Sequence, residues 1–99
     1  MFRGTTPTLE FVLPFNTDLL ENILMTVAQK NVPIINKTIA DATLSEDTVT
    51  IQLSQADTLK LNDKYDAHVQ LRVRTKNDEV MASDIFRVAV SQILKDGVI

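Results

Sequence analysis

The chain has 99 residues, 44% of them hydrophobic and 23% charged, which is the composition of one ordinary globular domain. Its 10 lysines and arginines against 13 aspartates and glutamates give a formal net charge of −3. This is the wrong sign for a protein whose affinity for nucleic acid comes from neutralising phosphates. The absence of cysteine excludes disulfides, thiolate zinc sites and cysteine nucleophiles.

Alternating apolar and polar residues predict a first strand over residues 7–13 and a second over residues 23–29. The segment between them, Pro14–Asp18, is rich in turn-forming residues. We expect Leu19 and Leu20, which follow this segment, to lie under the loop that it forms.

A tight turn at Lys30–Asn31 is expected to lead into a third strand over residues 32–39, because asparagine tolerates the positive φ that such a turn requires. The pattern of this strand is irregular. Pro33 has no amide hydrogen to donate, two isoleucines are adjacent, and Lys37 falls in phase with the apolar residues. These features predict an edge strand with a bulge.

The middle of the chain predicts a fourth strand over residues 48–53, a capped helical turn and a fifth strand over residues 65–74. Ser54 and Asp57 have the spacing of a capping box at the start of the helical turn. The fifth strand has the cleanest alternation of the whole chain. Tyr65 opens it at the place where an immunoglobulin-like sandwich often keeps a tyrosine corner, with the ring in the core and the hydroxyl bonded to backbone.

A sixth strand is expected over residues 80–90, with Val80, Ala82, Phe86, Val88 and Val90 on its apolar face and Asp84 as the one discordant residue. Short antiparallel strands that are apolar on one face close a core most simply as two packed sheets. The sequence therefore predicts an all-β, immunoglobulin-like antiparallel β-sandwich of six to seven strands. A small barrel is the alternative. A single domain covers residues 1–99, with a flexible or partner-docking tail at 93–99.

No catalytic or metal-binding pattern stands out in the sequence. His68 is the only histidine, so a metal site would have to draw its other ligands from carboxylates and amides, and a solvated surface histidine is the simpler interpretation. With only two glycines, the chain has no glycine-rich phosphate loop. We expect neither enzymatic activity nor a cofactor.

The N-terminal residues lack the apolar stretch of a signal peptide, and no run approaches the roughly 20 apolar residues needed to span a bilayer. We therefore expect no membrane association and residence in the cell that makes the protein.

The candidate interaction surface combines arginines of the last two strands with aliphatic residues of the tail. Its members are Arg72, Arg74, Arg87, Ile93, Leu94, Val98 and Ile99. Cross-strand pairing with Asp84 or Glu10 would explain the arginines, and an acidic surface on a protein partner is the sharper alternative. The tail carries more apolar surface than a small domain usually leaves in water. It either folds back on its own sandwich or docks on a neighbouring subunit.

Several segments of the chain resemble those of small, mostly uncharacterised proteins of tailed phages and prophages of Gram-positive bacteria. These segments are Arg3–Thr8, Phe11–Phe15, Leu53–Gln55, Thr58–Leu61, Val69–Thr75 and Ala82–Phe86. The pattern T-P-T-x-x-F from Thr6 to Phe11 is similar, more loosely, to the start of the N-terminal β-sandwich module of phage baseplate upper proteins. No site residues carry over from either group.

This resemblance implies a virion or tail-associated structural or assembly protein. Its partners would be further copies of itself and other phage structural proteins, and it would lie in the virion, or in the cytoplasm of the bacterial host during assembly. The alternative is a ligand-binding or adhesion β-sandwich module for a carbohydrate or a host surface. That role needs outward aromatic side chains, and with Tyr65 expected to point inward the sequence offers few.

Overall fold

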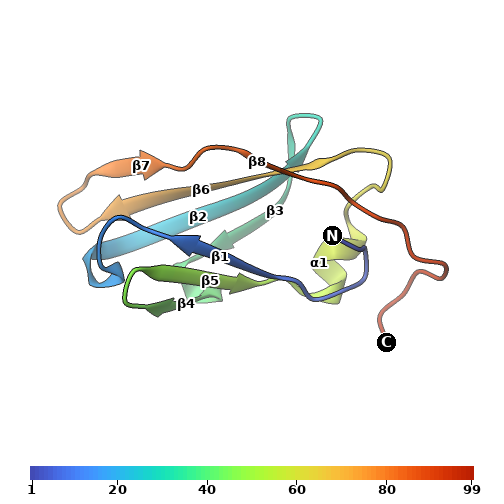
Figure 1. Ribbon diagram of the computed structural model, residues 1–99, viewed down its shortest axis with the longest axis horizontal. Coiled ribbons are helices and arrows are strands. Elements are labelled where there is room, and N and C mark those ends of the chain that lie inside the picture. Colours follow the sequence, from blue (N-terminus) through green and yellow to red (C-terminus); the bar gives the residue numbers. More distant parts are fainter.

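Two antiparallel sheets pack face to face in the computed structural model, which describes residues 1–99 (Figure 1). The strands are β1 (Thr8–Val12), β2 (Leu20–Gln29), β3 (Val32–Thr38), β4 (Ala42–Ser45), β5 (Thr48–Gln52), β6 (Ala67–Thr75), β7 (Val80–Ala82) and β8 (Phe86–Val88), and the helix α1 spans Gln55–Leu59. One sheet has the order β1-β5-β4; the other has the order β3-β2-β6-β7, with β8 also paired to β6. The predicted all-β sandwich is confirmed, with eight strands in place of six or seven.

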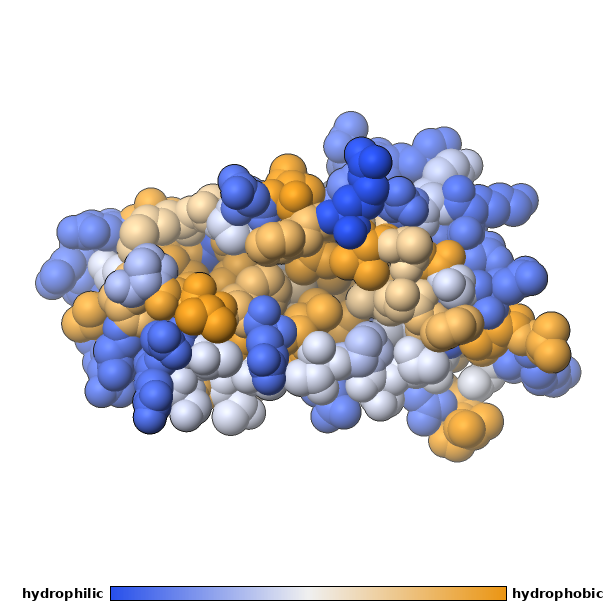
Figure 2. Space-filling model, viewed as in Figure 1, coloured by the Kyte–Doolittle hydropathy of each residue, from blue (hydrophilic) through white to orange (hydrophobic).

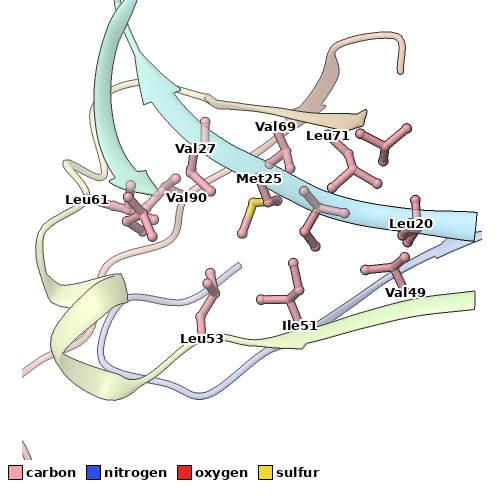
Figure 3. Close-up of a cluster of buried hydrophobic side chains, with 14 residues drawn as sticks. Leu20, Met25, Val27, Val49, Ile51, Leu53, Leu61, Val69, Leu71 and Val90 are labelled. Atoms are coloured by element: carbon pink, nitrogen blue, oxygen red, sulfur yellow. The ribbon is translucent and has the colours of Figure 1, made fainter. Parts of the chain in front are cut away.

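A core of 14 buried hydrophobic side chains fills the space between the two sheets (Figure 3). Leu20 and Met25 of β2 point toward Val49 and Ile51 of β5, and all four are buried. The apolar faces predicted for these strands and for β6 are confirmed, because every second residue is buried in β5, in β6 and, from Ile23 onward, in β2.

The tight turn and the irregular edge strand that follows it are also confirmed. Lys30 and Asn31 have φ values of 51° and 63°, as a two-residue hairpin turn between β2 and β3 requires. The register between these strands shifts beside Pro33, leaving Ile34 as the extra residue of a bulge. No strand pairs with the other side of β3, so it is an edge strand.

The predicted capping box begins α1. The Asp57 amide donates to Ser54 Oγ over 3.0 Å, and the Ser54 amide donates to Asp57 Oδ2 over 2.9 Å. The same carboxylate accepts the inward-pointing ammonium of Lys37, whose Nζ lies 2.8 Å from Asp57 Oδ2. Burial on its own raises the pKa of Asp57, but Lys37 and the Ser54 backbone and side chain hold that pKa below its ordinary value of 3.8. This ion pair ties β3 of one sheet to the helix that follows β5 of the other.

The expected tyrosine corner is wrong. Tyr65 lies in the turn before β6 and is 39% exposed, with Lys30 Nζ 4.3 Å from its ring centroid. Gln29 makes the backbone contacts instead: its buried amide donates to the Asn62 and Tyr65 carbonyls over 2.7 and 2.9 Å and accepts from the Asn62 amide over 2.8 Å. A side chain of β2, rather than the tyrosine, therefore fixes the turn before β6.

The expectation for the loop before β2 is half wrong. Leu20 is buried as the first residue of β2, but Leu19 is exposed. Leu19 ends a short 3-10 turn, Thr17–Leu19, whose backbone holds its side chain outside the core.

The single last strand expected over residues 80–90 is also wrong, because Ser83–Ile85 divide it into β7 and β8. The Ser83 hydroxyl accepts the Leu71 amide over 3.0 Å and so replaces a backbone group in the ladder. Directly paired residues share a face of the sheet, so pairing with Arg74 and Arg72 places Val80 and Ala82 on the outer face. After the break the apolar residues face the other way, because pairing with Val69 and Ala67 directs Phe86 and Val88 inward. Of the five residues expected on the apolar face, only Val90 is buried.

Candidate interaction surfaces

Arg72 and Arg74 lie side by side on the outer face of the five-stranded sheet. Both are exposed, and neither forms an ion pair, so pairing with Asp84 or Glu10 does not explain them. Together with Leu24, Thr38 and Val80 they line a shallow hollow of about 290 Å³. Two unpaired guanidinium groups beside apolar and hydroxyl side chains can donate hydrogen bonds to carboxylates of another molecule.

Arg87 shares this outer face but lies further along the sheet. It is paired across β6 and β8 with His68, two outward positions away from Arg72. Its Nε lies 3.8 Å from Asp66 Oδ2, a loose and exposed ion pair. His68 is half-buried beside it on the outer face. We refer to Arg72, Arg74 and Arg87 as the basic face.

The tail, Ile93–Ile99, runs beside the N-terminal residues and α1 (Figure 1). Polar contacts hold it there: Arg3 Nη1 lies 2.8 Å from Asp96 Oδ1, and the Gln55 side chain exchanges two hydrogen bonds with the Ile99 backbone. Ile93 is half-buried against Gly4, where a methyl group would come within 2.9 Å of Ile93 Cδ1. Gly4, at φ +71°, thus has both the conformation and the space that only glycine supplies.

The remaining aliphatic side chains of the tail have no cover. Leu94 and Ile99 are fully exposed, and Val98 is 66% exposed. The tail therefore rests on its own domain mainly through polar groups and Ile93, while three aliphatic side chains face solvent. The residues that the sequence grouped together fall on two separate surfaces, the basic face and the tail.

An apolar groove that sequence reasoning missed lies between the end of β1 and β7. It has a volume of about 250 Å³, and seven of its nine lining residues are hydrophobic. The lining residues are Val12, Leu13, Pro14, Phe15, Leu71, Val73, Met81, Ala82 and Ser83. Figure 2 shows the apolar band that runs lengthwise across this side of the molecule. We call this feature the side groove; in the sequence, only the discordant Asp84 hinted at the strand break beside it.

A second hollow, of about 350 Å³, is polar. Its lining includes the exposed ring of Tyr65 together with Lys30, Lys64, His68 and Arg87. The expectation that Tyr65 points inward is therefore wrong.

No group of three or more histidine, cysteine, aspartate or glutamate residues is placed to hold a metal ion. No helix of the structure is both long enough and apolar enough to cross a membrane.

Comparison with protein-family models found no match, and comparison with curated proteins found none either. Among solved structures, the chain is similar to the immunoglobulin-like domain of mouse leukocyte-associated immunoglobulin-like receptor 1, determined as a strand-swapped dimer. The TM-score is 0.55 at 11% identity, over 92% of this chain and 84% of that one. This likeness establishes the immunoglobulin-like fold.

Proposed function

We propose that the chain is a non-enzymatic structural or assembly protein of a phage virion, tail or baseplate that acts through protein–protein contacts. The observation that carries the proposal is the tail, whose Leu94, Val98 and Ile99 side chains face solvent. Apolar surface exposed in this way is typical of an interaction site. The resemblance of the sequence to small phage and prophage proteins supplies the setting, in the virion or in the host cytoplasm during assembly.

The contacts that hold the tail favour binding over simple disorder. Arg3 and Gln55 fix the backbone of the tail through Asp96 and Ile99 while leaving its aliphatic side chains free. A segment that is already ordered loses less conformational entropy when a partner covers it. The tail is thus a preformed apolar contact surface.

The basic face supports a second contact, with a different structural protein. Arg72 and Arg74 lack ion-pair partners within the chain, and carboxylates of a partner would form charge-assisted hydrogen bonds with them. Copies of the chain would then join through the tail, and other components of the particle would bind the basic face.

The genes that flank the coding sequence test the phage setting. The proposal predicts genes for tail, baseplate or capsid proteins on both sides. A metabolic operon around the coding sequence would contradict it.

A ligand-binding or adhesion module is the second candidate, and the polar hollow beside Tyr65 is the observation that favours it. The exposed tyrosine ring offers a stacking surface for a sugar, and Lys30, Lys64 and Arg87 surround it with donors. Thermal-shift measurements with a panel of sugars distinguish the two functions. Saturable stabilisation by one sugar that is lost in Tyr65→Ala favours adhesion, whereas no stabilisation by any sugar favours the assembly protein.

A further inference from the structure

We propose that the side groove is an acceptor site for the end of the tail, Gly97–Ile99, of a second copy of the chain, so that copies join head to tail. This inference rests on the proposed function and names the partner of the tail.

The first argument is a free strand edge beside the groove. The Leu13 amide donates to the Asp47 carbonyl over 2.7 Å, and the Leu53 amide donates to the Pro7 carbonyl over 2.9 Å. In an antiparallel pair, such contacts alternate along the strand. The backbone groups of the intervening residues Thr8, Glu10 and Val12 therefore point away from β5, toward the open edge.

The edge of β7 is free in the same way. The Thr75 amide donates to the Glu79 carbonyl, and the Ser83 amide donates to the Leu71 carbonyl. By the same alternation, the backbone groups of Val80 and Ala82 point away from β6. Unpaired backbone groups thus border the groove on both sides, and they can pair with an added extended segment.

The strand order explains why this edge is open. Immunoglobulin sandwiches place strands A, B, E and D in one sheet and G, F and C in the other. The order β1-β5-β4 corresponds to B, E and D, and the described residues include no strand A beside β1. A single parallel bridge between Phe2 and Ser91 covers the side near α1, so only the part near β7 stays open.

The tail matches the groove in chemistry but lies at the other end of the molecule. The groove is lined mostly by hydrophobic residues, and Val98 and Ile99 are aliphatic side chains without cover. Nothing lies within 4 Å of the position of a methyl group on Gly97, so the tail has open space around it there. Docking on another copy would exchange the two hydrogen bonds between Gln55 and Ile99 for contacts in the groove. The two surfaces lie toward opposite ends of a long axis of 46 Å (Figure 1), so a contact between them joins different copies.

Such a contact uses two different surfaces on each copy. Heterologous contacts of this kind close into rings when the rotation between copies allows it and otherwise form filaments. Each copy would fill the open edge of the next, and only the copy at an unclosed end would leave its groove empty.

Disulfide trapping tests this contact, because the chain has no cysteine of its own. One protein sample carries Met81→Cys in the groove. A second, isotope-labelled sample carries Val98→Cys in the tail. The two are mixed, oxidised mildly and analysed by mass spectrometry for mixed dimers. The matched control replaces Met81→Cys with Thr43→Cys, an exposed position on the outer face of the three-stranded sheet. Val12→Cys, also in the groove and 72% exposed, serves if Met81→Cys disturbs the fold.

The inference predicts several times more mixed dimer from the groove pair than from the control pair. Equal yields overturn it. If the native chain nevertheless has a mass above that of one chain, only the acceptor site is wrong and the proposed self-association stands; a single-chain mass contradicts both.

Discussion

At the residue scale, Gln29 holds the turn before β6 with three hydrogen bonds to backbone. Gln29→Leu removes three hydrogen bonds made by a buried side chain and leaves the part-buried Asn62 amide without this partner, so we expect a loss of about 1 to 3 kcal/mol in the free energy of unfolding. Tyr65→Phe removes only an exposed hydroxyl and should change stability by less than about 0.5 kcal/mol. Chemical denaturation measures both, and a larger effect from the tyrosine would restore the tyrosine corner.

The Asp57 carboxylate makes stability depend on pH. Its pKa in the folded chain lies below the ordinary value of 3.8, so its stabilising contribution is complete above that value. The contribution is lost as the pH falls through the lower, folded pKa. We expect the denaturation midpoint of the native chain to decrease over this acidic range. Asp57→Asn should lower the midpoint at neutral pH and make its decrease at acidic pH smaller. The matched control is Asp63→Asn at an exposed position. If the midpoint of Asp57→Asn decreases at acidic pH as much as that of the native chain, Asp57 is not the cause of the pH dependence.

At the scale of elements, β6 carries the clearest prediction. Leu71 is buried between the sheets, so Leu71→Ala should destabilise by about 2 to 5 kcal/mol through lost burial and a residual cavity. Its neighbour Arg72 is exposed and unpaired, and Arg72→Ala should cost less than about 0.5 kcal/mol. Gln70 is a poorer control, because it donates to the Ser83 carbonyl over 3.0 Å. Equal losses for Leu71→Ala and Arg72→Ala in chemical denaturation would contradict the assigned faces.

The elements also show how far the sequence alone reaches. Period-two patterning predicts β2, β5 and β6 correctly, since each is covered by the opposite sheet and its burial follows the pattern. The same argument fails for β7 and β8. Because Ser83 interrupts the ladder, Val80 and Ala82 before it face outward, whereas Phe86 and Val88 after it face inward. The side groove could not be predicted for a related reason. It depends on which strands end up at the edges, and local pattern carries no information about that.

At the scale of the whole molecule, the sandwich places its contact surfaces far apart. The basic face covers the outside of one sheet, the tail leaves the end near α1, and the side groove opens toward the other end of the long axis. The sequence identified the arginines and the tail residues as candidates, but their separation depends on the path of the last segment along the sandwich. A protein arranged in this way can bind neighbouring copies and a different partner at the same time.

The central claim is that the chain associates with itself through its tail, and the molar mass in solution tests it most directly. Light scattering over a range of concentrations should show the native chain rising above its single-chain mass of 11.1 kDa. Val98→Asp, which leaves the backbone contacts of Gln55 with Ile99 in place, should lower the mass toward that of one chain, while Thr43→Asp on the remote face should not. A native mass of 11.1 kDa at every concentration, or equal effects of the two substitutions, would contradict the account.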